Sequence, residues 1–234
     1  MNGPSPTFSV VIPALDEADE LPATLDSIES ALGPSAEILV VDGGSRDGTR
    51  RVAASRARLV ESIAGRGRQL AAGAELARGQ ALLFLHADTR LGPGTGAALD
   101  RALDRSGVVG GCFELSLQGP TADSWRARLL AAAINLRSRI LRTATGDQAI
   151  FCRREVYLRA GGFGSEELFE DVLFYRRLRR LGTVVVLKPP VRTSDRRWRA
   201  DGYLRTIITH LTLRLLFLTG VAPRRLARLY GRGQ

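Results

Sequence analysis

Short apolar runs alternate with helix-like segments through the first half of the chain, and this alternation constrains the fold more than any other feature. The apolar runs cover residues 8–15, 36–44, 58–63 and 81–88. Between them, residues 16–32, 47–57 and 69–77 carry apolar side chains at helical spacing. Strands that alternate with helices favour a parallel arrangement. We therefore predict an α/β fold with a mostly parallel central sheet that helices cover on both faces.

Polar or glycine-rich residues follow each of these apolar runs, at residues 14–17, 42–47, 65–69 and 86–89. In parallel sheets of this kind, ligands bind outside the carboxyl ends of the strands. We therefore expect the four polar segments to converge on one edge of the sheet and to line a binding site there.

The second half of the chain is less regular. Strand patterns cover residues 108–117, 149–154 and 184–191, and helix patterns cover residues 124–141 and 170–182. A last apolar stretch, residues 203–222, is interrupted by Arg205, His210 and Arg214. It is too polar for a membrane span, so we expect a packed or interfacial helix. No internal repeat or flexible linker is visible, and one compact unit is the simplest interpretation.

Composition excludes several classes of function. The formal net charge of +10 comes almost entirely from arginine, because Lys188 is the sole lysine. Arginine clusters suit phosphate contacts but also solvated helix faces, and an aromatic content of 6% disfavours nucleic acid as a partner. The two cysteines, Cys112 and Cys152, form no CxxC pair, which opposes a zinc finger or a redox dithiol. The N-terminus lacks the pattern of a secretory signal, so we expect a cytoplasmic protein.

Two glycine-rich segments are candidates for nucleotide binding. Asp42 ends an apolar run and precedes the turn GGSRDGT, where a carboxylate can accept hydrogen bonds from a ribose or a base. The alternative is that Asp42 or Ser45 only caps the next helix. The segment GRGRQ places Arg66 and Arg68 at the start of a helix, which suits a pyrophosphate, although it is not a full dinucleotide fingerprint.

Carboxylates at two further places could support chemistry. Asp88 ends the run LFLHAD and is the best candidate metal ligand, because hard divalent cations prefer carboxylate and phosphate oxygens. His86 could assist with Mn²⁺ or contact the nucleotide. Glu170 and Asp171 are adjacent acids between aromatic residues, a setting that suits a general base. The competing interpretations are a helix cap for Asp88 and helix-dipole complementarity for the acid pair.

The order of these motifs resembles glycosyltransferase family 2. The resemblance runs from about Ser9 to Trp198 through VVIPALDE, ILVVDGGSRDGT, GRGRQ, LFLHADT, GDQAIFCRR, FEDVLF and SDRRW. Within the family, the chain looks most like the small bacterial radical-SAM/selenodomain-associated transferases, some of which are named arsenosugar biosynthesis glycosyltransferases. The resemblance implies a single GT-A domain over residues 1–234, with a Rossmann-like sheet. Residues 8–107 would form the nucleotide-binding half, residues 108–198 a mixed acceptor and catalytic half, and residues 199–234 a C-terminal helical segment.

The resemblance also implies roles for individual residues. Those expected at the nucleotide and donor are Pro13, Ala14, Glu17, Asp42, Arg66, Arg68, His86, Ala87 and Asp88. Asp88 matches the last acid of the family's DxD motif, which binds Mn²⁺ or Mg²⁺ through the donor diphosphate. Asp171 matches the second acid of the ED motif, the base that deprotonates the acceptor. Residues expected near the acceptor or the diphosphate are Asp147, Gln148, Glu170, Arg196, Arg197 and Trp198.

His86 departs from the family pattern, because it stands where the first acid of DxD is common. The loss of that carboxylate could alter metal preference but leaves Asp88 in place. The implied reaction is a single inverting displacement, in which metal and arginines neutralise the departing nucleoside diphosphate and Asp171 takes the acceptor proton. The expected donor is a UDP- or GDP-sugar, and the acceptor is a small molecule or a lipid-linked group.

Three other interpretations stay open. A nucleotidyltransferase would usually carry a phosphate loop directly after the first strand, where IPALDE stands here. A non-catalytic nucleotide-sugar-binding protein would have no need of both Asp88 and Asp171. A transferase that acts on a polyprenyl phosphate would work at the inner face of the membrane, and the apolar C-terminal stretch with PRRLAR could supply a peripheral contact with anionic lipid.

Overall fold

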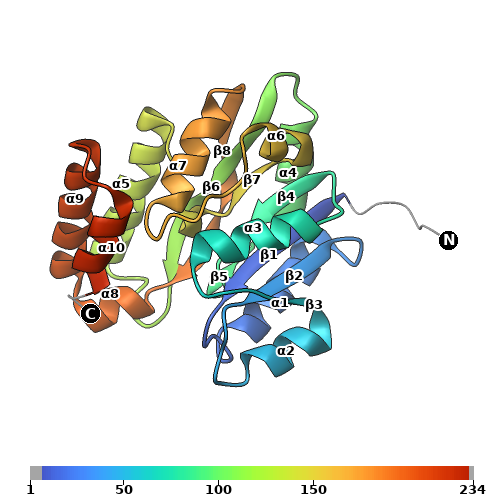
Figure 1. Cartoon of the computed structure of the whole chain (residues 1–234), viewed down its shortest axis with the longest axis horizontal. Helices are drawn as coiled ribbons and strands as arrows, with labels where there is room; N and C mark the ends of the chain where they lie inside the picture. The colour runs from blue at the N-terminus through green and yellow to red at the C-terminus, as the bar shows by residue number, and fades with distance from the viewer. Residues whose placement is uncertain (1–6, 232–234) are drawn as a thin grey trace.

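The predicted alternation of strands and helices forms one eight-stranded sheet in the computed structural model, which describes residues 7–231 (Figure 1). The strands are β1 (Phe8–Ala14), β2 (Glu37–Asp42), β3 (Arg58–Glu61), β4 (Ala81–Phe84), β5 (Thr89–Arg90), β6 (Val108–Gln118), β7 (Ile150–Arg153) and β8 (Thr183–Ser194). The expectation about a signal segment rests partly on residues 1–6, and the C-terminal segment includes residues 232–234; both stretches lie outside the described residues.

Helices connect the strands and cover the sheet. They are α1 (Leu21–Leu32), α2 (Thr49–Arg56), α3 (Arg66–Leu76), α4 (Thr95–Leu103), α5 (Trp125–Leu141), α6 (Arg154–Arg159), α7 (Glu170–Arg179), α8 (Arg196–Asp201), α9 (Tyr203–Leu218) and α10 (Pro223–Gly231), with a short 3₁₀ turn, η1 (Gly146–Gln148). Among the described residues, no helix is long and apolar enough to cross a membrane.

The strand order is β3-β2-β1-β4-β7-β6-β8-β5. Strands β1 to β4 pair in parallel, as the alternating first half predicts. Strand β7 is antiparallel to both β4 and β6, whereas β8 returns parallel to β6. The predicted α/β fold with a mixed second half is therefore confirmed.

Side chains of each central strand enter two separate cores, one on each face of the sheet. In β1, Val10 and Ile12 pack on the face that α1 and α4 cover, while Val11 points to the face that α3, α6 and α7 cover. All three side chains are fully buried. A strand buried on both faces reads as a continuous apolar run, which explains why the first half was legible in the sequence.

Two strand ends differ from the predicted ones. The run at residues 81–88 leaves the sheet after Phe84, and the chain then forms β5, which pairs with β8 through Thr89 and Thr193. The strand expected to stop at the prolines continues to Ser194. It can do so because the register of β8 against β6 shifts between Leu187 and Val191, so the intervening prolines sit in a bulge that needs no ladder N–H. Both differences bring the end of β8 beside Asp88.

Candidate active site

The loop after β1 is fastened to the loop after β2 by a set of short polar contacts. Backbone N–H groups of the first loop donate to side chains of the second, and one bond runs the other way. The contacts are Asp16 N–H to Ser45 Oγ (3.0 Å), Glu17 N–H to Thr49 Oγ1 (2.8 Å), Ala18 N–H to Asp47 Oδ2 (3.0 Å) and Arg46 N–H to Asp16 Oδ1 (2.7 Å). The two strand tips are thus one rigid unit, and Glu17 projects from it.

Asp42 lies at the centre of this unit, as the sequence predicted, but its carboxylate is already occupied. It accepts hydrogen bonds from the N–H groups of Gly44 (3.0 Å) and Ser45 (3.2 Å) and is almost fully buried. Asp42 therefore shapes the glycine-rich turn. The helix-start contact belongs instead to Asp47, which accepts the N–H of Thr49 at 2.8 Å.

Gln69 is a positioning residue that the sequence did not single out. Its Nε2 donates to the backbone oxygens of Ala14 (2.9 Å) and Val41 (2.8 Å), so it clamps the ends of β1 and β2 together. The side chain is 4% exposed. Pro13 and Ala14, expected at the nucleoside, lie at this clamped end of β1, opposite Val41 and Asp42. The available signal in the sequence was the glutamine at the end of GRGRQ. Its burial, which requires hydrogen-bond partners for the amide, is seen in the structure.

Arg66 and Arg68 separate in the structure, although the sequence placed both near the diphosphate. Arg66, at the start of α3, forms an ion pair with Glu170 (Nη1 to Oε1, 3.5 Å). Burial opposes ionisation of Arg66, but Glu170, Asp171, Asp147 and Asp88 together raise its pKa. Arg66 is therefore the common cation of the acidic groups. The side chain of Arg68, by contrast, is exposed.

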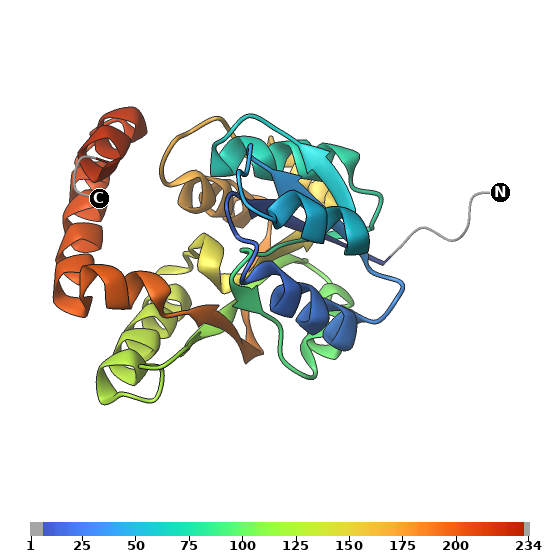
Figure 2. The same ribbon diagram turned by 90° about the horizontal axis from the view of Figure 1, so that it is seen from below.

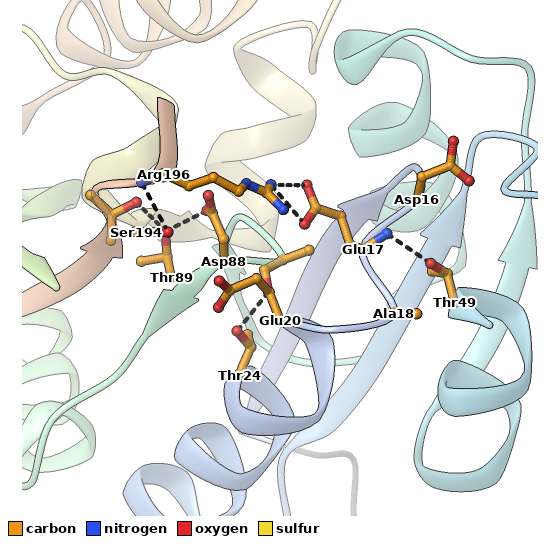
Figure 3. A network of polar contacts seen from close by, with 12 residues as sticks. Asp16, Glu17, Ala18, Glu20, Thr24, Thr49, Asp88, Thr89, Ser194 and Arg196 are labelled. Atoms are coloured by element: carbon orange, nitrogen blue, oxygen red, sulfur yellow. Dashed lines mark hydrogen bonds and ion pairs between the residues drawn. The ribbon is translucent and has the colours of Figure 1, made fainter. Parts of the chain in front are cut away.

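Asp88 lies in the same network of polar side chains as Glu17, Glu20 and Arg196 (Figure 3). The guanidinium of Arg196 donates to both oxygens of Glu17, at 2.9 and 3.0 Å. Among the described residues, the side-chain partner of the Asp88 carboxylate is Thr89 Oγ1, at a long 3.5 Å. Burial raises the pKa of Asp88 most, Arg196 opposes that rise, and Glu20 adds to it. The charge of Asp88 is thus poorly compensated by the protein alone.

The backbone of Asp88 is held from the far end of β8. Its carbonyl oxygen accepts the N–H of Ser194 at 3.2 Å and Nε2 of Gln118 at 3.4 Å. The preceding residue, Ala87, is buried, and its carbonyl accepts the hydroxyl of Thr24 at 2.6 Å. The expected contact of Ala87 with the donor stays a prediction.

Glu170 and Asp171 form the buried acid pair at the start of α7, with 3% and 9% of their surfaces exposed. Asp171 accepts two backbone N–H groups at 2.6 Å, from Gly146 and from Val172. Burial raises the pKa of Asp171, and Arg66 and the two N–H groups oppose that rise. Burial and the neighbouring Asp171 raise the pKa of Glu170 to about 7. Both groups thus ionise above the ordinary range of carboxylic acids.

A glutamine at position 170 is expected to make the protein more stable at alkaline pH. The raised pKa means that the folded state holds the Glu170 proton more tightly than the unfolded chain does. Ionised Glu170 therefore costs stability as pH rises from about 4.5 to about 7. Urea unfolding of Glu170→Gln should show a gain of about 1–3 kcal/mol at pH 8 that largely disappears at pH 4. The exposed neighbour variant Glu167→Gln should show no such difference. A Glu170→Gln protein less stable than wild type at pH 8 would mean that the Arg66 pair outweighs burial.

The imidazole of His86 lies against Gly146. A Cβ placed on Gly146 would be 2.5 Å from His86 Nε2 and 3.5 Å from Asp171 Oδ2. His86 Nε2 is buried and has no hydrogen-bond partner among the described residues. Burial first, and then the charges of Arg66 and Arg197, hold the pKa of His86 well below its usual range. His86 is therefore neutral, and it supports the turn whose N–H binds Asp171.

Asp147 and Gln148, expected to face the donor or the acceptor, have different surroundings. Gln148 is fully buried: its Oε1 accepts from Ser138 Oγ (2.9 Å) and Arg137 Nη2 (3.2 Å), and its Nε2 donates to Phe113 O (3.2 Å). Because both ends of its amide are bonded inside the protein, we revise its expected role to that of a residue that fixes η1. Asp147 has a buried Oδ1 without a hydrogen-bond partner in the described chain.

The motif Arg196-Arg197-Trp198 opens α8, and its three side chains diverge. Arg196 reaches Glu17, whereas the Arg197 guanidinium lies over the ring of Tyr230 at 5.3 Å. Trp198 stacks on Tyr203, with ring centroids 5.9 Å apart. Arg196 is thus the member of the motif that bonds to a residue expected at the nucleotide. Trp198 instead joins α8 to α9.

Asp195, just before this motif, was missed in the sequence. It has no exposed surface and accepts the N–H of Thr121 and Nε of Arg199, each at 2.8 Å. Burial raises the pKa of Asp195, but these hydrogen bonds lower it more. Asp195 therefore holds the first turn of α8, and with it Arg196, in place. In the sequence, the only sign of this positioning role was an acid directly before an arginine pair.

The acids fit a divalent cation that a diphosphate helps to hold. Within residues 7–231, no three His, Cys, Asp or Glu side chains are grouped closely enough to bind a metal by themselves. Asp88 is a hard oxygen donor with an undercompensated charge. Mg²⁺ and similar ions are commonly held by one or two carboxylates, substrate phosphates and water. The donor set therefore suits a shared metal and does not suit a metal cage built by the protein alone.

Known proteins resemble this chain in sequence. A family model described as Glycosyl transferase family 2 matches residues 9–170. The PGL/p-HBAD biosynthesis glycosyltransferases of Mycobacterium tuberculosis and Mycobacterium bovis are 40% identical over 95 residues. Those alignments cover 37% of this chain and 37% of each relative.

Solved structures share the fold. A structure of S. aureus TarS in complex with UDP-GlcNAc has a TM-score of 0.60 at 19% identity, over 80% of this chain and 58% of that one. Glucosyl-3-phosphoglycerate synthase from Mycobacterium tuberculosis, in complex with Mn²⁺, UDP and its product, has a TM-score of 0.55 at 22% identity, over 80% and 70% of the two chains. At these identities the likeness concerns the fold alone.

Proposed function

The chain belongs to glycosyl transferase family 2, and on that premise we propose that it moves a sugar from a nucleoside-diphosphate sugar to a hydroxyl acceptor by a single inverting displacement. The observation that carries the proposal is the buried acid pair Glu170 and Asp171, in which Arg66 pairs with Glu170 and the Gly146 N–H binds Asp171. The charges of Asp88 and Asp147 act on the same arginine. These acids come from separate parts of the chain. Such a set can serve both the departing diphosphate and the entering nucleophile.

Asp171 is the proposed base. Two backbone N–H groups fix its carboxylate, and burial raises its pKa above the ordinary value, which makes it a better proton acceptor. In the proposed step, Asp171 takes the proton of the acceptor hydroxyl as that oxygen bonds to the anomeric carbon. The bond from the anomeric carbon to the diphosphate oxygen breaks on the opposite face, and its electron pair leaves with the nucleoside diphosphate.

The second task of the site is to stabilise the negative charge that develops on the leaving group. Arg66 and Arg196 form ion pairs with Glu170 and Glu17, and fixed cations stabilise charge that develops during a reaction. Asp88 would hold Mn²⁺ or Mg²⁺ together with the diphosphate, and the bound ion would act as a Lewis acid on the phosphate oxygens. His86 is proposed to support η1 without binding the metal, because its Nε2 is packed against Gly146.

Solved relatives narrow the proposed substrates. The TarS and glucosyl-3-phosphoglycerate synthase structures contain UDP or UDP-GlcNAc, and the latter enzyme also contains Mn²⁺. We extend to this chain a UDP-sugar donor, with a GDP-sugar as the second choice. The motifs also support the radical-SAM/selenodomain-associated (arsenosugar-type) subgroup as a proposal. The acceptor is a small molecule or, if the protein is peripheral to a membrane, a lipid-linked group such as a polyprenyl phosphate.

Donor binding is expected to require metal and Asp88. In a thermal-shift screen of UDP- and GDP-sugars with Mn²⁺, the correct donor at 100 times its Kd should add about 2.7 kcal/mol to the stability of the protein. Omitting Mn²⁺, or using Asp88→Asn, should remove most of that gain. Asp100→Asn changes an exposed acid on α4 and should leave it intact. A wild-type protein that no nucleotide sugar stabilises, with or without metal, would contradict the proposed function.

A further inference from the structure

Helix α9 presents an apolar stripe to the outside of the molecule. Its buried residues, Thr206 and Leu213, are seven positions apart and lie on one face. The opposite face carries five apolar residues, and each of them is 54% to 74% exposed. They alternate in spacing between four and three positions: Leu204, Ile208, Leu211, Leu215 and Leu218. Residues at this spacing share one side of a helix. A continuous exposed stripe of this kind marks an interaction surface.

Helix α5 has the same character. It turns Ala127 and Ser138 inward, whereas Trp125 is 69% exposed and Leu129 is 62% exposed. Leu136 and Ile140 continue the outward face. Both helices stand at the same end of the long axis of the molecule, together with α8 and α10 (Figures 1 and 2). We call the outward sides of α5 and α9 the apolar end face.

The formal charges within α5, α9 and α10 have a single sign, although Asp123 and Asp201 lie just before α5 and α9. The sequences of α5, α9 and α10 contain no aspartate or glutamate, and each contains at least two arginines. Arg224, Arg225 and Arg228 on α10 are exposed. A binding partner of this face must therefore offer an apolar region that the exposed side chains can enter, together with negative charge for the arginines. A second copy of this chain would bring further arginines, which like-charge repulsion opposes.

We propose that the apolar end face docks on an anionic lipid bilayer. Helices with an apolar stripe and arginines on their flanks lie in the plane of the membrane interface, with the apolar side chains among the acyl chains and the cations at the lipid phosphates. None of the helices described between residues 7 and 231 could span the bilayer. Attachment is therefore peripheral and reversible, and high salt weakens it.

Helix α9 itself adjoins the proposed catalytic acids. Phe169, directly before Glu170, stacks on Phe217 of α9 with ring centroids 4.6 Å apart. Arg214 of α9 donates to Thr143 Oγ1 at 3.3 Å, just before η1. A protein docked through α9 would keep the acceptor side of Asp171 close to the lipid surface. This position favours an acceptor carried by a membrane lipid over a freely diffusing one, a step that rests on the proposed function.

Vesicle flotation of the purified full chain, without any nucleotide sugar, tests the docking. We expect binding to vesicles of phosphatidylcholine and phosphatidylglycerol, much weaker binding to phosphatidylcholine alone, and release in high salt. Leu211→Glu/Leu215→Glu should lower the partition coefficient by more than about tenfold. Arg224→Glu/Arg225→Glu should lower it on the anionic vesicles. Leu158→Glu, which places the same charge on an exposed leucine of α6, should not.

Two outcomes would overturn the inference. The first is a failure to bind lipid through this face: either the wild-type protein floats with neither vesicle, or the Leu211→Glu/Leu215→Glu protein floats as well as wild type. The second is a dimer in light scattering that the same double variant dissociates, while vesicles are not bound; the occupant would then be a second copy. The donor-induced thermal shift should be the same in all these variants, so a failure of docking is distinguishable from a failure of the proposed function.

Discussion

Asp171→Asn is expected to lower turnover with the true acceptor by about 10²–10⁴, the usual contribution of a general base. Asparagine keeps the shape of the side chain and an oxygen that can accept the Gly146 N–H, so the fold and η1 should be preserved. Donor binding should survive, because the donor contacts are assigned to other residues. The measurement is kcat with saturating donor, alongside the donor-induced thermal shift.

Glu170→Gln is the matched control for this prediction. Glu170 is the more buried acid and is paired with Arg66, so its loss should cost much less turnover than the loss of Asp171. It should also move the acidic limb of the kcat/KM profile to lower pH, because one negative charge beside Asp171 is removed and Arg66 is released to it. If Glu170→Gln lost 10²-fold or more while Asp171→Asn kept wild-type turnover, the base would be Glu170.

Gly146→Ala is expected to have the second largest effect, a loss of about tenfold to a hundredfold in kcat. The added Cβ would meet His86 Nε2 at 2.5 Å, so either the imidazole or η1 must move. Movement of η1 withdraws the Gly146 N–H, which now lies 2.6 Å from Asp171 Oδ2. A hydrogen bond to a charged group is worth about 1.5–3 kcal/mol, which sets the expected size of the effect.

A second substitution tests the cause of that loss. His86→Ala removes the atoms that the new Cβ would strike, so His86→Ala/Gly146→Ala should recover part of the kcat lost in Gly146→Ala. Gly92→Ala is the control, because a Cβ there meets only ordinary contacts at 3.9 Å. A double variant slower than both single variants would show that the two residues act separately and that His86 has a direct role in the reaction.

The site residues could be listed from the sequence but not arranged. Asp88 and Asp171 were readable because each follows or begins an element with a clear apolar pattern. The occupied state of Asp42, the burial of Gln148 and the divergence of Arg66 from Arg68 were not readable. The last two depend on partners that are distant in sequence, Phe113 for Gln148 and Glu170 for Arg66, whereas Asp42 is bonded by Gly44 and Ser45 of its own turn.

The sequence by itself determined the parallel first half, the position of its polar strand ends and the identity of the acids, because buried strands and amphipathic helices leave local periodic patterns. Only the tertiary structure decided which of these groups meet. Strand β8 continues past its prolines and pairs with β5, and this brings Ser194 and Arg196 to Asp88. The turn at Gly146 brings an N–H to Asp171 and sets His86 against it. Hydrogen bonds and ion pairs between distant segments leave no periodic trace, so the environment that tunes each acid belongs to the fold.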